Sequence, residues 1–214
     1  MVSEIIDISQ SIRPGIPVWP GDTGFEIHEN WTISQNCPVL VSKITMSTHT
    51  GTHADAHSHY HKDGIDTASR NLAPYLGRCV VVDATGGKGP VGCDAVLPAV
   101  EKYDDFPQRV LIRSLSRFPR DTWPDQFRAI CPKLIDKLGE HGCCLIGTDA
   151  PSIDPESSKI LEAHHAVHRH DMAILEGLIL DHVVPGLYEL IALPLRIENA
   201  DASPVRAILR TLAT

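Results

Sequence analysis

The sequence predicts a mixed α/β domain in which strands predominate and a few helices lie on the outside of the sheet. Short apolar runs rich in valine, isoleucine and leucine recur along the chain, and turn-forming residues bound them. Helix signals are fewer. The clearest is the amphipathic stretch 132–139, with Pro132 in its first turn and Gly139 at its end. With 43% hydrophobic content, residues 1–214 are expected to form one domain with a substantial core.

The composition argues against several classes of protein. A formal net charge of −8 argues against non-specific nucleic-acid binding, which normally needs a basic surface. No apolar run reaches the roughly 18 residues that a membrane-spanning helix requires, and the acidic N-terminal segment does not resemble a signal peptide. The six cysteines are scattered and form no CxxC pair, so we expect reduced thiols and a cytoplasmic protein.

In the first half of the chain, apolar or alternating patterns predict strands over residues 4–9, 25–33, 39–46, 78–83 and 108–114. Residues 94–103 are expected to form a short helix capped by Asp94. Residues 13–22 hold three prolines and two glycines, which predict a fixed loop. Trp19 stands on this loop, where it could anchor the loop to the core or form a flat wall for an aromatic substrate.

The second half adds a buried strand over residues 143–147 and a helix that begins at Asp154 and Pro155 and runs to Arg169. On that helix His164 shares the inward stripe, whereas His165 turns outward. An apolar strand over residues 172–180 and a last strand over residues 188–197 follow.

Residues 48–61 carry the clearest chemical signal, because five of the 12 histidines and one carboxylate fall within them. Imidazole and carboxylate are usual ligands of zinc, manganese and iron. Four of these side chains occupy odd positions: His49, His53, Asp55 and His59. Small residues stand between them, so an extended chain would place all four on one face. The alternative is a solvated histidine-rich loop.

The spacing of His49 and His53 also predicts a bend. Four residues of straight strand span roughly 13 Å, which two imidazoles on one metal ion can barely bridge. Gly51 lies between the two histidines and permits the chain to turn there.

Glu176 is a second anomaly, because it is an ionisable residue inside the apolar run 172–180. Burying an unpaired carboxylate costs at least several kcal/mol. Glu176 is therefore expected to be paired, protonated or metal-bound, and we favour metal binding.

The pattern His-x-Gly-Thr-His-x-Asp-Ala-x-x-His over residues 49–59 resembles the signature of the metal-dependent cyclase/hydrolase family. Within that family the chain is most similar to the bacterial kynurenine formamidases, which the loop with Trp19, the pair His164 and Glu176, and the segment 201–209 also resemble. The family often has proline where this chain has His57, so the role of this extra imidazole stays open. The resemblance implies a barrel-like sheet of the family's swivelling β/α/β type and a homodimer.

The resemblance also implies residue roles. The implied metal ligands are His49, His53, Asp55, His164 and Glu176. His59 would be the catalytic acid/base, and Trp19 would line the substrate pocket. Five protein ligands exceed the three that a catalytic zinc commonly takes, so we expect two zinc ions per subunit, with manganese or another divalent ion as an alternative.

In this arrangement Asp55 bridges the two ions, with His49 and His53 on one ion and His164 and Glu176 on the other. Two ions a few Å apart can share one hydroxide at neutral pH. An imidazole at position 59 could move the proton in both directions. The reaction expected from the resemblance is hydrolysis of the small aryl formamide N-formyl-L-kynurenine to L-kynurenine and formate, a step of tryptophan degradation.

Two alternatives stay open. One is another hydrolase of the family, such as an enzyme that opens a cyclic aryl amide like isatin. The other is a zinc-binding module without catalysis, which would normally have closed, cysteine-rich coordination. None of the expected ligands here is cysteine. No nucleic-acid or membrane partner is expected.

Overall fold

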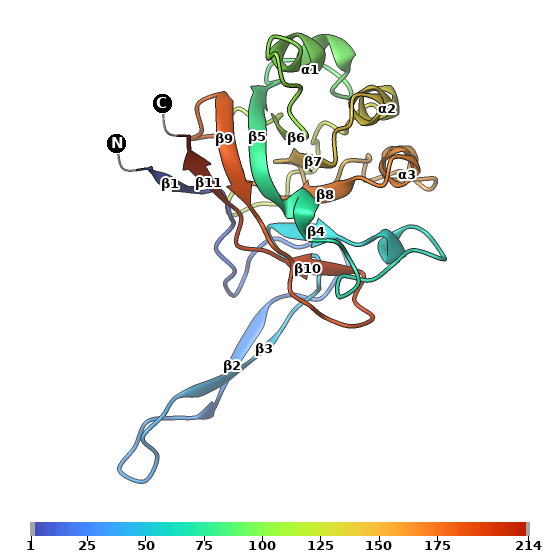
Figure 1. Cartoon of the computed structure of the whole chain (residues 1–214). Coiled ribbons are helices and arrows are strands. Elements are labelled where there is room, and N and C mark those ends of the chain that lie inside the picture. The colour runs from blue at the N-terminus through green and yellow to red at the C-terminus, as the bar shows by residue number, and fades with distance from the viewer. Residues whose placement is uncertain (1–2, 213–214) are drawn as a thin grey trace.

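The computed structural model describes residues 3–212, and its centre is a curled sheet of nine strands (Figure 1). In spatial order these strands are β1 (Ile5–Asp7), β11 (Ile208–Thr211), β9 (Gly186–Ile191), β5 (Leu76–Asp83), β6 (Arg109–Arg113), β7 (Leu145–Thr148), β8 (Ala173–Glu176), β4 (His53–Asp55) and β10 (Ala202–Pro204). Strands β5 to β8 run parallel to one another, whereas the pairs on either side are antiparallel. The predicted α/β fold class is confirmed.

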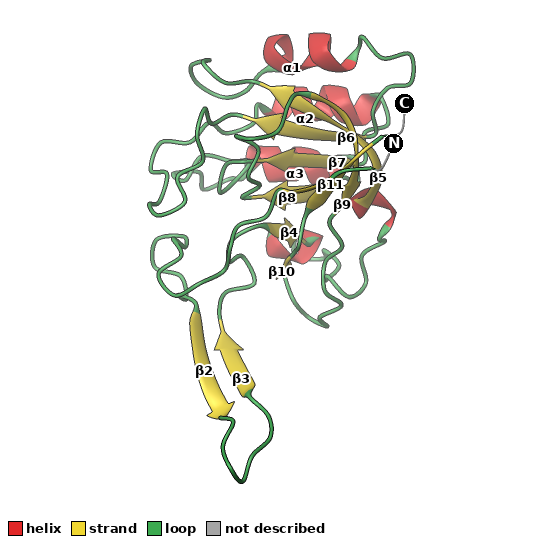
Figure 2. Ribbon diagram, turned by 90° about the vertical axis from the view of Figure 1, so that its left-hand side faces the viewer, coloured by secondary structure: helices red, strands yellow, loops and turns green. Residues whose placement is uncertain are grey.

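Helices cover one face of this sheet (Figure 2). They are α1 (Cys93–Val100), α2 (Pro132–Glu140) and α3 (Glu162–Arg169), and two short 3-10 helices, η1 (His57–His59) and η2 (Ala73–Tyr75), lie in the connections. On β6, Val110 and Ile112 face the helices, and Leu111 faces the second core inside the curl. Because both faces of the parallel strands are buried, their sequences are continuously apolar.

A separate hairpin projects from the body (Figures 1 and 2). It consists of β2 (Glu26–Trp31) and β3 (Val41–Thr45), which pair with each other and form their own two-stranded sheet. Every residue of both strands is exposed. The sequence predicted the two strands but not their separation from the main sheet.

Three local predictions were wrong. The helix expected from Asp154 begins only at Glu162, because residues 155–161 form turns and bends. Asp154 still accepts hydrogen bonds from the first turn of α3, from the backbone N–H groups of Ala163 and His164. The N-cap of α1 is Gly92, not Asp94. The last strand expected over residues 188–197 ends at Ile191, and two further strands, β10 and β11, follow it.

All six cysteines are free thiols, as predicted. Burial raises the pKa of the Cys79 and Cys143 thiols to about 12, so both are held in the neutral form. Among the helices within residues 3–212, none combines the length and the apolar character needed to cross a membrane.

Candidate metal centre

The five predicted ligand residues converge from separate parts of the chain. His53 and Asp55 lie on β4, Glu176 ends β8, and the register of this antiparallel pair places His53 directly opposite Glu176. His49 stands in the turn before β4, and His164 projects from α3. Opposed residues of paired strands have Cβ atoms about 5 Å apart. The backbone ladder alone therefore brings the two halves of the predicted site together.

Two glycines allow the histidine-rich turn to approach the end of β8. Gly51 has a φ of 69°, so the chain turns between His49 and His53, as predicted. Gly177 has a φ of 65°, and a Cβ atom there would lie 2.7 Å from the Gly51 carbonyl oxygen. The Thr52 hydroxyl donates a hydrogen bond to the Gly177 carbonyl at 2.7 Å. A side chain at position 177 would therefore separate the turn from β8.

The expectation that four side chains share one face of an extended chain is wrong for two of them. Only His53 and Asp55 lie on a strand. His49 belongs to the preceding turn, and His59 ends the short helix η1. The alternation in the sequence thus corresponds to a three-residue strand between two tightly turning segments.

The spacing of the ligand atoms fits a shared metal ion better than direct hydrogen bonds. Asp55 Oδ1 lies 3.2 Å from His49 Nδ1 and 3.4 Å from His53 Nε2. Asp55 Oδ2 lies 3.4 Å from His164 Nε2, and Glu176 Oε2 lies 3.4 Å from His53 Nε2. Charge-assisted hydrogen bonds between such groups measure about 2.7–2.9 Å. Two ligand atoms that are each about 2.1 Å from one tetrahedral ion lie roughly 3.4 Å apart.

Four ligand atoms in this cluster are buried and have no hydrogen-bond partner among the described residues. They are His53 Nε2, both carboxylate oxygens of Asp55, and His164 Nε2. An unsatisfied buried polar group costs about 1–3 kcal/mol and is rare in native proteins. A divalent cation would satisfy all four at once, so the residues present fit zinc or manganese.

Asp55 is the residue common to two groups of candidate ligands. One group comprises His49, Asp55 and His59, the other comprises His53, Asp55 and Glu176, and within each group the ligand atoms lie within 4.8 Å of one another. Glu176 also faces His164, with 3.7 Å between Oε1 and Nε2. His53 thus lies as close to Glu176 as to Asp55, with 3.4 Å between the nearest ligand atoms in both pairs. This differs from the expected division, which placed His53 and Glu176 on different metal ions. The assignment of these residues as ligands stays a prediction.

The carboxylates and imidazoles of the cluster shift one another's pKa values. Burial by itself lowers the pKa of His53, but the Asp55 and Glu176 carboxylates outweigh this effect and raise the pKa to about 10. Burial likewise lowers the pKa of His164, and the carboxylates of Asp154 and Asp55 raise it to about 10. Burial tends to raise the pKa of Asp55, but the surrounding imidazoles hold it well below its usual value. The metal-free cluster therefore retains protons on its histidines.

Two further carboxylates orient the histidines, and the sequence alone did not identify them. Asp154 Oδ2 lies 2.6 Å from His164 Nδ1 and also accepts the His164 backbone N–H. Asp201 Oδ2 lies 3.1 Å from His49 Nε2, and the Thr48 hydroxyl donates to Asp201 Oδ1 at 2.8 Å. A carboxylate on the second ring nitrogen fixes the orientation of a metal-binding imidazole. Asp154 is thus positioned to leave His164 Nε2 facing the cluster.

His59 lies at the outer edge of the cluster. Its Nδ1 is 3.5 Å from Asp201 Oδ2, and its ring centre is 4.2 Å from that of His49. The side chain is 34% exposed and lines the cavity above the cluster. His59 is therefore more accessible than His53, Asp55, His164 and Glu176, and its role as acid/base stays a prediction.

His57, whose role was open, points away from the cluster. Its Nε2 lies 3.1 Å from the Met172 carbonyl oxygen, and its ring contacts the Arg70 guanidinium. Burial and the positive charge of Arg70 lower the pKa of His57. The extra imidazole is therefore a neutral packing group in the layer beneath α3.

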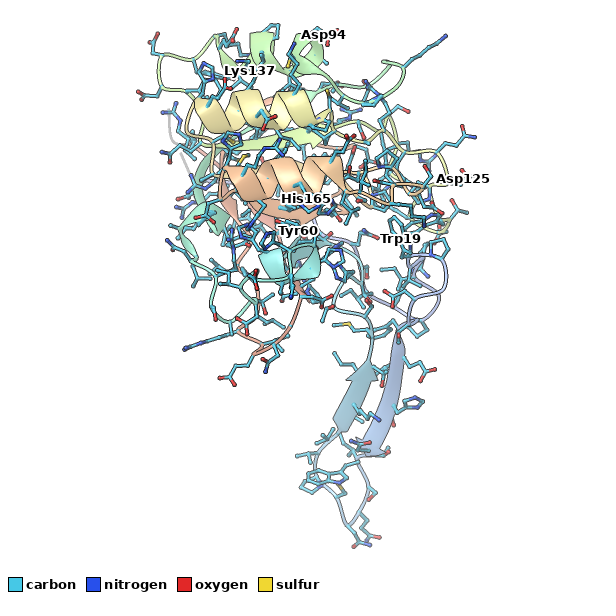
Figure 3. All side chains as sticks on the ribbon, turned by 90° about the vertical axis from the view of Figure 1, so that its right-hand side faces the viewer. Trp19, Tyr60, Asp94, Asp125, Lys137 and His165 are labelled. Atoms are coloured by element: carbon cyan, nitrogen blue, oxygen red, sulfur yellow. The ribbon has the colours of Figure 1, made fainter. Side chains whose placement is uncertain are left out.

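A cavity of about 350 Å³ opens onto the cluster, and its walls come from two loops distant in sequence. Trp19 stands on the first loop and Trp123 on the second, with ring centres 5.5 Å apart in an edge-to-face contact. Arg13 and Asp121 form an ion pair that joins the same two loops. Trp19 lies at the outer edge of the body (Figure 3). Trp123 had no distinguishing signal in the sequence, because its proximity to Trp19 arises only in the fold.

The chain is similar to known proteins in sequence and in fold. The Cyclase family model matches residues 6–155. Kynurenine formamidase of Maricaulis maris (strain MCS10) is 52% identical over 213 residues, covering 99% of this chain and 100% of the relative. Kynurenine formamidase of Erythrobacter litoralis (strain HTCC2594) is 51% identical over 208 residues, covering 97% and 94%. Among solved structures, isatin hydrolase A from Labrenzia aggregata shares the fold, with a TM-score of 0.84, 24% identity, and coverage of 99% and 94%.

The site and these relatives together define a hydrolytic enzyme. The chain belongs to the Cyclase family, and the predicted resemblance to bacterial kynurenine formamidases is confirmed.

Proposed function

We propose that this enzyme hydrolyses N-formyl-L-kynurenine to L-kynurenine and formate. The observation that carries the proposal is a cluster of three histidines and two carboxylates, four of them buried, that opens into a cavity walled by two tryptophans. The relatives named kynurenine formamidase support this choice of substrate. At about 350 Å³, the cavity lies at the small end of the range for ligand pockets, which suits a small substrate with a single aryl ring.

We assign metal binding to His49, His53, Asp55, His164 and Glu176, which would hold two zinc or manganese ions per subunit. When bound, a divalent metal would supply Lewis-acid chemistry, polarising the amide carbonyl and lowering the pKa of water so that hydrolysis is possible at neutral pH. Asp154 and Asp201 hold the rings of His164 and His49 in place from the side opposite the cluster.

The remaining chemistry falls to side chains that face the cavity. Trp19 and Trp123 contact the aryl ring of the substrate and orient the formyl group toward His53 and Glu176, which line the inner end of the cavity. His59 accepts a proton from the attacking water and donates it to the departing nitrogen when the carbon–nitrogen bond breaks. The products are then the free aryl amine and formate, and the imidazole returns to its starting state.

Parallel assays of N-formyl-L-kynurenine and isatin test this proposal. The zinc-loaded enzyme is expected to convert the formamide with a much higher kcat/KM than isatin. Treatment with a chelator should remove the activity, and added zinc or manganese should restore it. Faster opening of isatin, or formamidase turnover that survives complete removal of metal, would contradict the proposal.

A further inference from the structure

A second cavity, of about 460 Å³, opens to solvent between η1 and the segment that precedes α3. Its walls come from residues 58–62, 159–161 and 165. Figure 3 shows two of these residues, Tyr60 and His165, next to each other on one face of the body, whereas Trp19 of the first cavity lies well to one side of them. The two cavities therefore open at different places on the surface.

The second cavity carries positive charge. Lys62 and Lys159 line it together with three imidazoles. Of the carboxylates within residues 3–212, none lines it, although Asp63 and Glu162 directly follow wall residues in the sequence. Lys137 is the only lysine in this described part of the chain that forms an ion pair, so both lysines of the cavity lack a carboxylate partner there. The cavity is therefore a cationic surface in a chain whose formal net charge is −8.

The first cavity, which opens onto the metal-ligand cluster, has the opposite character. Its walls include the carboxylates of Asp22, Asp149 and Glu176. Of the lysines and arginines within residues 3–212, none lines this cavity. Apart from bound metal, its walls therefore offer a small anion no permanent positive charge.

The two cavities meet beside the reaction centre. His59 and Leu161 line both of them, so the two spaces adjoin at these side chains. In the proposed function, the carbon–nitrogen bond breaks next to His59, which donates the proton to the departing nitrogen. Formate is therefore produced where an acidic cavity adjoins a basic one.

Building on the proposed formamidase function, we propose that the second cavity binds formate on its way from the reaction centre to solvent. Formate is a carboxylate, so it is ionised at neutral pH. The ammonium groups of Lys62 and Lys159 attract it, and the exposed His165 ring can donate a hydrogen bond to it. The larger aryl amine leaves through the first cavity, past Trp19 and Trp123.

Titration of the zinc-loaded enzyme with isotope-labelled formate, followed by the width of the formate NMR signal, tests this proposal. Lys62→Gln/Lys159→Gln should bind formate about fivefold more weakly than the wild type, as expected for the loss of two exposed charges. Lys43→Gln/Lys88→Gln is the matched control, because it removes the same charge from exposed lysines that line neither cavity. This control should bind formate as the wild type does.

Product inhibition of N-formyl-L-kynurenine hydrolysis gives a second measurement. In Lys62→Gln/Lys159→Gln the inhibition constant of formate should rise about fivefold, whereas that of L-kynurenine should stay at the wild-type value. Unchanged formate binding in this variant would place formate on the metal alone, and an equal loss in the control would indicate general surface charge. Either result would overturn the proposal.

The titration needs no turnover, so it separates this proposal from the proposed function. Formate binding that depends on Lys62 and Lys159 in an enzyme without formamidase activity would support the anion site and contradict the proposed function. Formamidase activity with formate binding that ignores both lysines would do the reverse.

Discussion

His53 and Glu176 face each other across the antiparallel pair of β4 and β8, with His53 Nε2 3.4 Å from Glu176 Oε2. The two residues are far apart in sequence, yet the register of two short strands sets their separation. Asp55, two residues after His53 on the same strand, projects to the same side and faces His164. The centre of the proposed metal site is therefore built on strand pairing, helix α3 supplies His164, and the segments flanking β4 supply the outer members.

The position of Asp55 between the two ligand groups leads to a prediction about metal content. Asp55→Ala should lose both ions, because both groups share this carboxylate. Elemental analysis of purified protein measures the stoichiometry, and two ions per chain are expected for the wild type. Asp63→Ala, which removes an exposed carboxylate on the following turn, should keep the wild-type metal content. Loss of a single ion from Asp55→Ala would argue against a bridging role.

His59→Ala should separate catalysis from metal binding. The variant is expected to retain its metal and to lose turnover by about 10²–10⁴-fold, the usual contribution of an acid/base group. Metal analysis and kcat are measured on the same preparation. His61→Ala provides the control, because the His61 ring packs against His168 rather than against the ligands. If His59→Ala is instead metal-depleted, His59 is a ligand.

Trp123→Ala should weaken substrate binding more than it slows chemistry. Removal of the ring opens one wall of the cavity, so KM is expected to rise about tenfold, which corresponds to about 1.4 kcal/mol, while kcat changes little. Trp123→Phe should restore most of the lost affinity, since it retains an aromatic surface against Trp19. An unchanged KM in Trp123→Ala would place the substrate elsewhere in the cavity.

Asp154→Asn should weaken metal binding without removing a ligand. The amide has the same shape but cannot hold the His164 ring as a carboxylate does, and the zinc affinity is expected to fall by about 10–100-fold. Competition with a chelator measures the change. Asp136→Asn is a matched control, because Asp136 pairs with His170 on the outer side of the helices. Equal affinities in Asp154→Asn and the wild type would contradict the role of Asp154.

Metal loading should release protons. His53 and His164 have pKa values of about 10 in the metal-free cluster, so both rings are protonated at pH 7. Metal binds only neutral imidazole, so about two protons must leave on binding, and zinc affinity should rise with pH up to about pH 10. Calorimetry in buffers of different ionisation enthalpy counts these protons. Binding without proton release would show that the rings are neutral beforehand.

The same pKa shifts give the metal-free protein a pH-dependent stability. Because the pKa of each histidine is raised on folding, its contribution is complete below about pH 6.5, the unfolded value, and is lost as pH rises through about 10. Thermal unfolding of the metal-free protein should therefore shift to lower temperature between pH 7 and pH 10. A flat profile would contradict the assigned pairing.

The sequence predicted the parts of the site whose signals are local. Glu176 was identified because a carboxylate in an apolar strand needs a partner, and the turn at Gly51 followed from the spacing of His49 and His53. Asp201 could not be identified in this way, because 152 residues separate it from His49 and only the fold brings them together.

The strands of the hairpin were also predicted, but their placement was not. The alternation of apolar and polar residues within β2 and β3 indicates an extended chain, but it does not predict which sheet the strand joins. Asp154 was misassigned for a related reason. Its sequence neighbour Pro155 suggested the start of a helix, whereas the carboxylate bonds to N–H groups nine and ten residues away.

The ion pair of Arg13 and Asp121 ties together two loops that carry no predicted metal ligand. In the proposed function, substrate recognition and bond-breaking chemistry thus reside on different segments of the polypeptide. Exchange of these loops between homologues should therefore change which amides the enzyme prefers, while the side-chain cluster around β4 and β8 stays unchanged.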